Sequence, residues 1–187
     1  MTLGLIKLAA AGDFEADLMA QNTQRGSAKL ATAKTPGDVR DAIWQIDGSV
    51  NRLSVGGHID GWHLRTGGDV NSLNLGVVHQ AAVGDVDDPG QGRIRKLSAK
   101  QWTAGHIAAP SIGSVSIVGD RKDGRLKGNI GAELVLQDAS AKYALRRLCV
   151  SGWLDAPRVR SIASIGMVSV GGVRSTLSCV GTAPAET

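Results

Sequence analysis

The chain has 187 residues, enough for one domain with a substantial core. Hydrophobic residues make up 42% of it, yet only one Phe, one Tyr and four Trp are present, so aliphatic side chains must fill the interior, and 25 glycines beside 5 prolines argue against a disordered linker. The net charge of +4 comes from Lys and Arg scattered without interleaved aromatic residues, which argues against nucleic-acid binding.

The N-terminal stretch from Leu3 to Ala11 is apolar but makes a poor signal peptide. It has no basic segment before it, contains Lys7 and is followed by Asp13 and Glu15. No stretch of the sequence reaches the roughly 20 apolar residues of a membrane span. We therefore expect no membrane span.

A short repeat word begins in this stretch: an aliphatic residue, two variable residues, an aliphatic residue, one variable residue, an aliphatic residue, and usually Gly within two positions. Its copies are Leu3/Ile6/Leu8, Val50/Leu53/Val55, Val70/Leu73/Leu75, Ile94/Leu97/Ala99, Ile112/Val115/Ile117, Leu145/Leu148/Val150 and Ile165/Val168/Val170, with a weaker copy at Val39/Ala42/Trp44. The last two apolar positions lie on one face of a strand, and the three-residue step before them implies a bulge that keeps the first one pointing inward. Glycine after the word would allow the positive φ of a tight corner. Each word is predicted to be a strand with its corner.

A second, less regular strand is predicted between the words. Its copies are Trp44–Ile46, Trp62–Thr66, Ile107–Ala109 and Trp153–Leu154. Successive words begin 20 (50 to 70), 24 (70 to 94), 18 (94 to 112), 33 (112 to 145) and 20 (145 to 165) residues apart. This rhythm predicts an all-β fold, a parallel β-helix or β-solenoid with coils of about 20 residues and no substantial helix. The 33-residue interval is expected to hold a longer coil, an extra strand near Leu134–Leu136, or a loop.

The whole chain, 1–187, is predicted to form one continuous solenoid with a longer internal period. The matched segments are 2–13 with 111–120 and 50–57 with 165–172. They define one long unit of about 1–110 and an incomplete second unit of 111–187. Neither end shows a polar capping element, and residues 181–187 resemble a linker or tail. We expect the chain to be a fragment of a longer repeat protein.

An acidic loop between Gly84 and Gly92 is the candidate metal site. It places three carboxylates within four residues, Asp85, Asp87 and Asp88. Carboxylate oxygens suit Ca²⁺, but the loop lacks the ordered alternation and distant Glu of an EF-hand. We favour a polar turn in which Asp and Pro-Gly serve the backbone, and we predict no metal and no cofactor.

Two other polar groups give weaker signals. His58 and His63 point to opposite faces of a strand, so surface histidines are favoured over a metal site. Arg65 and Asp69 fall in coils next to the acidic loop, where a carbohydrate-active β-helix would gather carboxylates and basic residues on one lateral face. The sequence has no Ser/His/Asp word and no Gly-rich loop opening a helix, so we expect no enzymatic activity.

The tryptophans Trp44, Trp62, Trp102 and Trp153 each fall near the second strand of a coil. Pointing outward in a column they would suit sugar or a partner protein, with Trp62, Trp102 and Trp153 as the candidate ligand-binding residues. Pointing inward they would fill corners of the core. We favour the inward alternative.

Small basic clusters lie at 93–96, 121–122 and 146–147. We interpret them as solvated outer faces with a mild attraction for anionic polymers. Cys149 and Cys179 are too few for a disulfide framework and have no metal-ligand spacing, so we expect each to pack as a small apolar residue.

Two segments resemble repeats of very large bacterial surface proteins. They are Leu97–Ile107 (LSAKQWTAGHI) and Ile112–Asp120 (IGSVSIVGD). Such repeats are best represented among planctomycetes and are loosely similar to filamentous-haemagglutinin and autotransporter passenger repeats. The resemblance spans nearly the whole chain and implies a parallel β-helix displayed outside the cell, in proteins supposed to be adhesive or structural and with no catalytic motif to transfer.

The sequence therefore favours a non-enzymatic structural or adhesive segment of a large extracellular or cell-surface repeat protein. Its expected partners are cell-surface polysaccharide or neighbouring repeats of the same chain. A carbohydrate-binding or carbohydrate-processing β-helix is the second hypothesis. The third is a self-polymerising cytoskeletal β-solenoid in the cytoplasm, motivated by the poor signal sequence and the uncapped ends.

Overall fold

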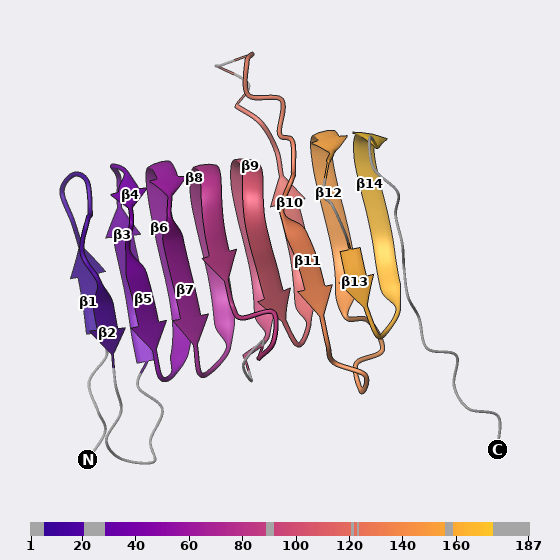
Figure 1. The fold of residues 1–187 in the computed structure, drawn as a ribbon, viewed down its shortest axis with the longest axis horizontal. Coiled ribbons are helices and arrows are strands. Elements are labelled where there is room, and N and C mark those ends of the chain that lie inside the picture. The colour runs from indigo at the N-terminus through magenta and orange to yellow at the C-terminus, as the bar shows by residue number, and fades with distance from the viewer. Residues whose placement is uncertain are drawn as a thin grey trace.

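The computed structural model describes residues 6–20, 29–88, 92–120, 122, 124–155 and 159–173. Within these ranges the chain forms one parallel sheet that winds into a β-solenoid of about seven coils (Figure 1). Its strands are β1 Ile6–Ala9, β2 Leu18–Ala20, β3 Lys29–Thr35, β4 Val39–Arg40, β5 Ile43–Ile46, β6 Ser49–Asp60, β7 Trp62–Thr66, β8 Val70–Val83, β9 Ile94–Ala109, β10 Ile112–Ile117, β11 Glu133–Leu136, β12 Leu145–Leu154, β13 Val159–Ser161 and β14 Ile165–Val173. The predicted all-β solenoid is confirmed, and the described part of the chain contains no helix that is long and apolar enough to cross a membrane.

Equivalent positions of the repeat word stack in register from coil to coil. The second apolar column, for example, contains Leu8, Ala33, Leu53, Leu73, Leu97, Val115, Leu148 and Val168. In the word at 94–99 the first, fourth and sixth residues are buried and the second and third are exposed, which is the inward and outward pattern that the bulge predicts. The aliphatic residues of the words therefore form the predicted columns of the core.

One copy of the word is not identified in the sequence, and another is wrongly identified. Leu30/Ala33/Thr35 is a true copy, since Leu30 pairs with Val50 and Thr35 with Val55. Ala and Thr conceal it because they replace larger aliphatic residues. The weaker copy Val39/Ala42/Trp44 is not a word, because Val39 pairs with Ile59 beyond the corner.

The N-terminal copy is shifted by one apolar position from the prediction. Leu8 pairs with Ala33 and so belongs to the second column, where the predicted word Leu3/Ile6/Leu8 places it in the third. A register irregularity lies between Ile6 and Lys7, and Leu3 lies outside the described residues.

After each word the chain forms two further extended segments, which we call the second and third segments. The short second segment contributes the column Phe14, Val39, Ile59, Val78, Trp102, Ile130, Leu154 and Val173. The third segment contributes the column Leu18, Trp44, Leu64, Val83, Ile107, Leu134 and Val159. The predicted second strands at Trp44–Ile46, Trp62–Thr66 and Ile107–Ala109 all lie in third segments.

The 33-residue interval between the words at 112 and 145 holds a loop and the regular third segment. The chain leaves the stack after Ile117, and Ile130 returns to the second-segment column between Trp102 and Leu154. The strand expected near Leu134–Leu136 is β11. The loop projects beyond the coils in Figure 1, so the insertion does not break the columns.

The glycines that follow the repeat words serve close packing, and the prediction of a positive φ there is wrong. Positive φ occurs instead at Gly61 (62°) and Gly105 (107°), at the corner between the second and third segments. At Gly76 the backbone carbonyls of Gly56 and Gly57 in the previous coil leave no room for a Cβ. Coils one strand spacing apart bring their corner backbones together, which requires glycine whatever the φ.

Aspartate side chains accept hydrogen bonds from backbone N–H groups at the corner before the second segment. The N–H of Asp38 donates to Asp13 Oδ1 at 2.8 Å, and the N–H of His58 donates to Asp38 Oδ1 at 2.7 Å, one coil further on. The bond from His58, with help from Arg40, lowers the pKa of the Asp38 carboxyl. Aspartate side chains thus join successive coils through hydrogen bonds to the backbone.

Candidate functional site

The acidic loop after β8 is organised around the Asp85 carboxylate. Asp85 Oδ2 accepts a hydrogen bond from Arg65 Nη2 at 2.8 Å, and Asp85 Oδ1 accepts one from the backbone N–H of Asp87 at 3.1 Å. The bond from Asp87 is the main cause that lowers the Asp85 pKa. The Asp85 side chain therefore stabilises the backbone of a polar turn. Among the described residues no group of three His, Cys, Asp or Glu side chains is placed to hold a metal ion.

The structure brings together only part of the lateral carboxylate face considered in the sequence. Arg65 and Asp85 form an ion pair, whereas Asp69 Oδ1 accepts a hydrogen bond from the backbone N–H of Arg93 at 2.9 Å. A carboxyl whose pKa is held low by an Arg and an N–H group stays ionised at neutral pH and is a weak general acid. These groups are suited to fixing the corners.

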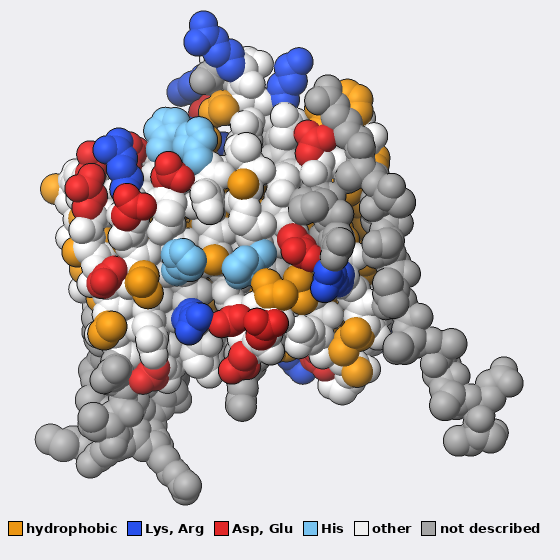
Figure 2. Space-filling view, in the orientation of Figure 1, with side chains coloured by type: hydrophobic (Ala, Val, Ile, Leu, Met, Phe, Trp, Pro, Cys, Tyr) orange, Lys and Arg blue, Asp and Glu red, His pale blue; other side chains and the backbone are white. Residues whose placement is uncertain are grey.

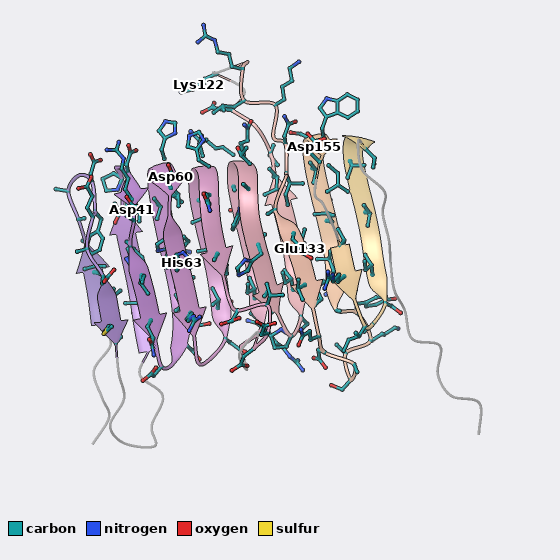
Figure 3. The ribbon with its side chains drawn as sticks, viewed as in Figure 1. Asp41, Asp60, His63, Lys122, Glu133 and Asp155 are labelled. Carbon is teal, nitrogen blue, oxygen red and sulfur yellow. The ribbon has the colours of Figure 1, made fainter. Side chains whose placement is uncertain are left out.

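The histidines associate in a way that the sequence analysis does not predict. His58 Nδ1 and His79 Nε2 lie 3.2 Å apart, and the two rings stack with centroids 5.4 Å apart. His63 is exposed on the third segment, in β7, where Figure 3 labels it. His58 and His63 are both exposed, as expected, but they lie on different segments rather than on opposite faces of one strand, and His58 meets a histidine of the next coil.

Three of the four tryptophans fill the core. Trp44, Trp62 and Trp102 are fully buried, which confirms the inward alternative for them and removes Trp62 and Trp102 from the candidate ligand-binding residues. Trp44 and Trp62 pack edge to face with ring centroids 5.4 Å apart. Trp153 is the exception, because its side chain is 36% exposed at the end of β12.

Cys149 does not pack into the core, contrary to the prediction. It occupies the fifth, outward position of its repeat word and is half-buried, with Arg147 Nε 3.2 Å from its sulfur. An outward position follows from the word itself, since only the first, fourth and sixth residues point inward. Cys179 lies outside the described residues.

One face of the solenoid carries cations and no acidic residue. We define the first face as the outward side of the repeat words, at residues 29–35, 49–55, 70–75, 94–99, 112–117, 145–150 and 165–170. Its outward cations are Lys34, Arg52, Arg95, Lys96, Arg146 and Arg147. These segments contain no Asp or Glu. The opposite side, seen in Figure 2, mixes acidic, basic and histidine side chains.

A hollow of about 330 Å³ lies on the first face between two of these cations. Its floor is Gly113 of β10, and its lining includes Arg95 of β9 and Arg146 of β12. A Cβ at Gly113 would lie 2.5 Å from the carbonyl oxygen of Arg95, so no side chain fits there without a shift of the backbone. The hollow therefore follows from the bulge of the repeat word and a glycine at its second position.

The corner beside the hollow adds a cation and an aromatic ring to its lining. Arg93 is held by Asp138, with Nη2 and Oδ2 3.3 Å apart, and Tyr143 follows in the loop before β12. Tyr143 is 41% exposed, and Lys142 Nζ lies 5.5 Å from its ring centroid. Guanidinium groups around a small floor suit an anion, and an exposed ring suits the apolar face of a sugar.

The hollow unites residues that the sequence analysis keeps apart. The basic clusters at 93–96 and 146–147 lie on outer faces, as expected, but their common face was not predicted. The available signal is that both clusters place Arg at the second position of a word and Arg or Lys at the third, two coils apart. Of the third cluster, Lys122 lies on the projecting loop labelled in Figure 3, and Arg121 is outside the described residues.

No protein-family model, no curated protein and no solved structure matches the chain.

Proposed function

We propose that this chain is a rigid structural or adhesive segment of a large cell-surface repeat protein. The observation that carries the proposal is the unbroken register of the apolar columns, from Ala33 to Val168, across coils of unequal length. Each coil contacts its neighbours along the axis, so the shape is set by stacking alone. Stacking of this kind yields an extended rod rather than an enclosed active-site cavity.

The insertions support the same proposal. The loop after β8, the projecting loop after β10 and the loop before β12 all leave the stack at corners, while the columns continue beneath them. At about 4.8 Å per coil, seven coils extend roughly 34 Å. A shaft of this kind displays variable loops and faces on a constant core, which suits adhesion.

Protease shaving of intact source cells tests the proposal. We expect peptides of this chain to be released, and mass spectrometry to assign them to a parent polypeptide much larger than 19.4 kDa. Peptides that stay protected until the cells are lysed, from a parent of about this mass, would refute both the surface location and the long shaft.

Self-polymerisation is a second candidate, favoured by the exposed apolar residues of the last described strand. Among the described residues β14 pairs with β12 alone, and it exposes Met167 (57%), Val168 (41%) and Val173 (44%). Stacking of a second copy on this strand would bury them. Sedimentation of the purified chain in 0.5 M salt separates the candidates: pelleted filaments favour polymerisation, and a monomer in the supernatant rejects it.

A further inference from the structure

At the second and third positions of the repeat word, the cations of the first face occupy alternate coils; Lys34, at the fifth position of the word 30–35, is outside this pattern. At the third position of the repeat word, successive coils carry Thr32, Arg52, Ser72, Lys96, Ser114, Arg147 and Met167. At the second position they carry Ala31, Asn51, Asn71, Arg95, Gly113, Arg146 and Gly166. Coils with Arg or Lys at these positions thus alternate with coils that are uncharged at both positions. Because neighbouring strands are about 4.8 Å apart, the cationic rows repeat about every 9.6 Å along the axis.

Fold stability explains why the cations alternate but not why acidic residues are absent between them. Like charges directly opposite each other on neighbouring strands are destabilising, and alternation avoids them. Acidic residues in the coils between the cationic ones would neutralise the cations and stabilise the face further. The third positions of those coils hold Ser72 and Ser114 instead. Among the described residues Arg146 has no ion pair. The first face therefore presents uncompensated positive charge to an external anion.

The polar groups between the rows suit a partner rich in hydroxyl groups. Ser98 Oγ donates to Asn74 Oδ1 at 2.6 Å, and Asn71 Nδ2 donates to Asn51 Oδ1 at 3.0 Å. These bonds orient the amides and hydroxyls on a flat strand surface. A sugar chain lying along the axis would meet fixed donors and acceptors between the cationic rows.

We propose that the first face binds an anionic polysaccharide with one carboxylate on every second sugar, lying along the solenoid axis with one acidic sugar in the hollow at Gly113. Arg95 and Arg146 take its carboxylate as charge-assisted hydrogen-bond donors, and Tyr143 covers a sugar ring. This inference rests on the proposed function, since it names the ligand class of an adhesive shaft. Alternate acidic sugars place charges at a spacing close to that of the rows.

A nucleic acid fits the same face less well. In duplex DNA the phosphates of one strand repeat about every 3.4 Å along the helix axis, far more often than the cationic rows. The outward positions of the first face carry no aromatic residue on which bases could stack. Single-stranded DNA is therefore the competitor against which the proposal is tested.

The test measures binding of the full chain to hyaluronan by biolayer interferometry in 150 mM salt, with dextran as the uncharged polymer and poly(dT) as the competing polyanion. The double variant R95A/R146A removes the two cations beside Gly113. Its matched control, K122A/K127A, removes two exposed cations from the projecting loop. The variant S114E places a carboxylate between the cationic rows without deleting any cation, and circular dichroism verifies that each variant folds.

We expect hyaluronan to bind and dextran not to bind. R95A/R146A and S114E should each weaken hyaluronan binding by about tenfold or more, while K122A/K127A stays within about twofold of the unmodified chain. Absence of hyaluronan binding, equal losses in R95A/R146A and K122A/K127A, or tighter binding of poly(dT) would each overturn the inference. Protease shaving reads the location and the parent mass but not ligand binding, so a surface-exposed chain of a large parent that does not bind hyaluronan refutes this inference and leaves the shaft proposal standing.

Discussion

Replacing Val115 with Asp tests the assignment of the inward columns. Val115 is fully buried in the second column, where it pairs with Leu97 on one side and Leu148 on the other. A carboxylate there has no polar partner in the column above or below it. Val168 occupies the same column at β14 but is 41% exposed, so Val168→Asp is a matched control that places the same charge within reach of water.

The expected cost follows from proton linkage. An Asp with an ordinary pKa of about 3.9 must be protonated before burial, which costs about 4 kcal/mol at pH 7. Loss of the valine methyl groups and of hydrogen bonds to water adds about 2 kcal/mol. The sum of about 6 kcal/mol is comparable to the whole stability of a typical domain, about 5 to 15 kcal/mol. Val168→Asp should cost less than about 1 kcal/mol.

Guanidinium chloride unfolding, followed by far-UV circular dichroism, measures both variants. At pH 4 the introduced carboxyl is about half protonated in the unfolded chain, so the deficit of Val115→Asp relative to the unmodified chain should fall to about 2.5 kcal/mol. A Val115→Asp protein within about 1 kcal/mol of Val168→Asp at pH 7, or a deficit that does not change with pH, would refute the inward assignment.

Three further predictions concern the polar and glycine positions. Thr35→Val should raise the free energy of unfolding by about 1 kcal/mol, because Thr35 Oγ1 is buried without a hydrogen-bond partner among the described residues; a loss of stability would contradict this. Gly105→Ala should lower it by more than about 1 kcal/mol, since the added Cβ meets the Ala81 carbonyl at a positive φ, whereas Gly124→Ala has open space and should be neutral in the same unfolding assay. The corner carboxyls with lowered pKa values are Asp38, Asp85 and Asp138. Their stabilisation is complete above the ordinary pKa of 3.8 and is lost as pH falls through the lowered folded values, so Asp138→Asn should flatten the dependence of the unfolding midpoint between pH 4.5 and pH 2.5, and an unchanged slope would argue against it.

The architecture was predictable because a stacked core requires apolar residues at the same positions of every coil. Wherever large aliphatic residues occupy those positions, as at Val50/Leu53/Val55, the word is visible in the sequence. At Leu30/Ala33/Thr35 small residues fill two positions, and only the pairing with the next coil identifies the copy. Trp62 shows a signal that was present but unused: it lies beside Ala81 in its column, and a large residue next to a small one indicates an inward position.

The surface sites were harder to predict because they depend on register between coils of unequal length. His58 and His79 are 21 residues apart and stack, whereas Arg93 and Asp138 form an ion pair across 45 residues. Because the coil lengths vary between 18 and 33 residues, the sequence spacing does not define which outward side chains lie next to each other at a corner. Within the words the register is fixed, which is why the basic clusters could have been aligned from the sequence.

The first face shows how a solenoid combines a constant core with a specific surface. A rod that only spans distance needs its inward columns, and its outward positions are free to mix charges of both signs, as the third segment does with Arg160 and Glu133. The first face instead has no acidic residue in its repeat words, places the cations of the second and third word positions on alternate coils, and opens a hollow at Gly113. Alternation limits repulsion within the sheet, and the exclusion of acids keeps the positive field directed outward. Both features together are what an anion outside the chain would require, and the polysaccharide inference is built on that match.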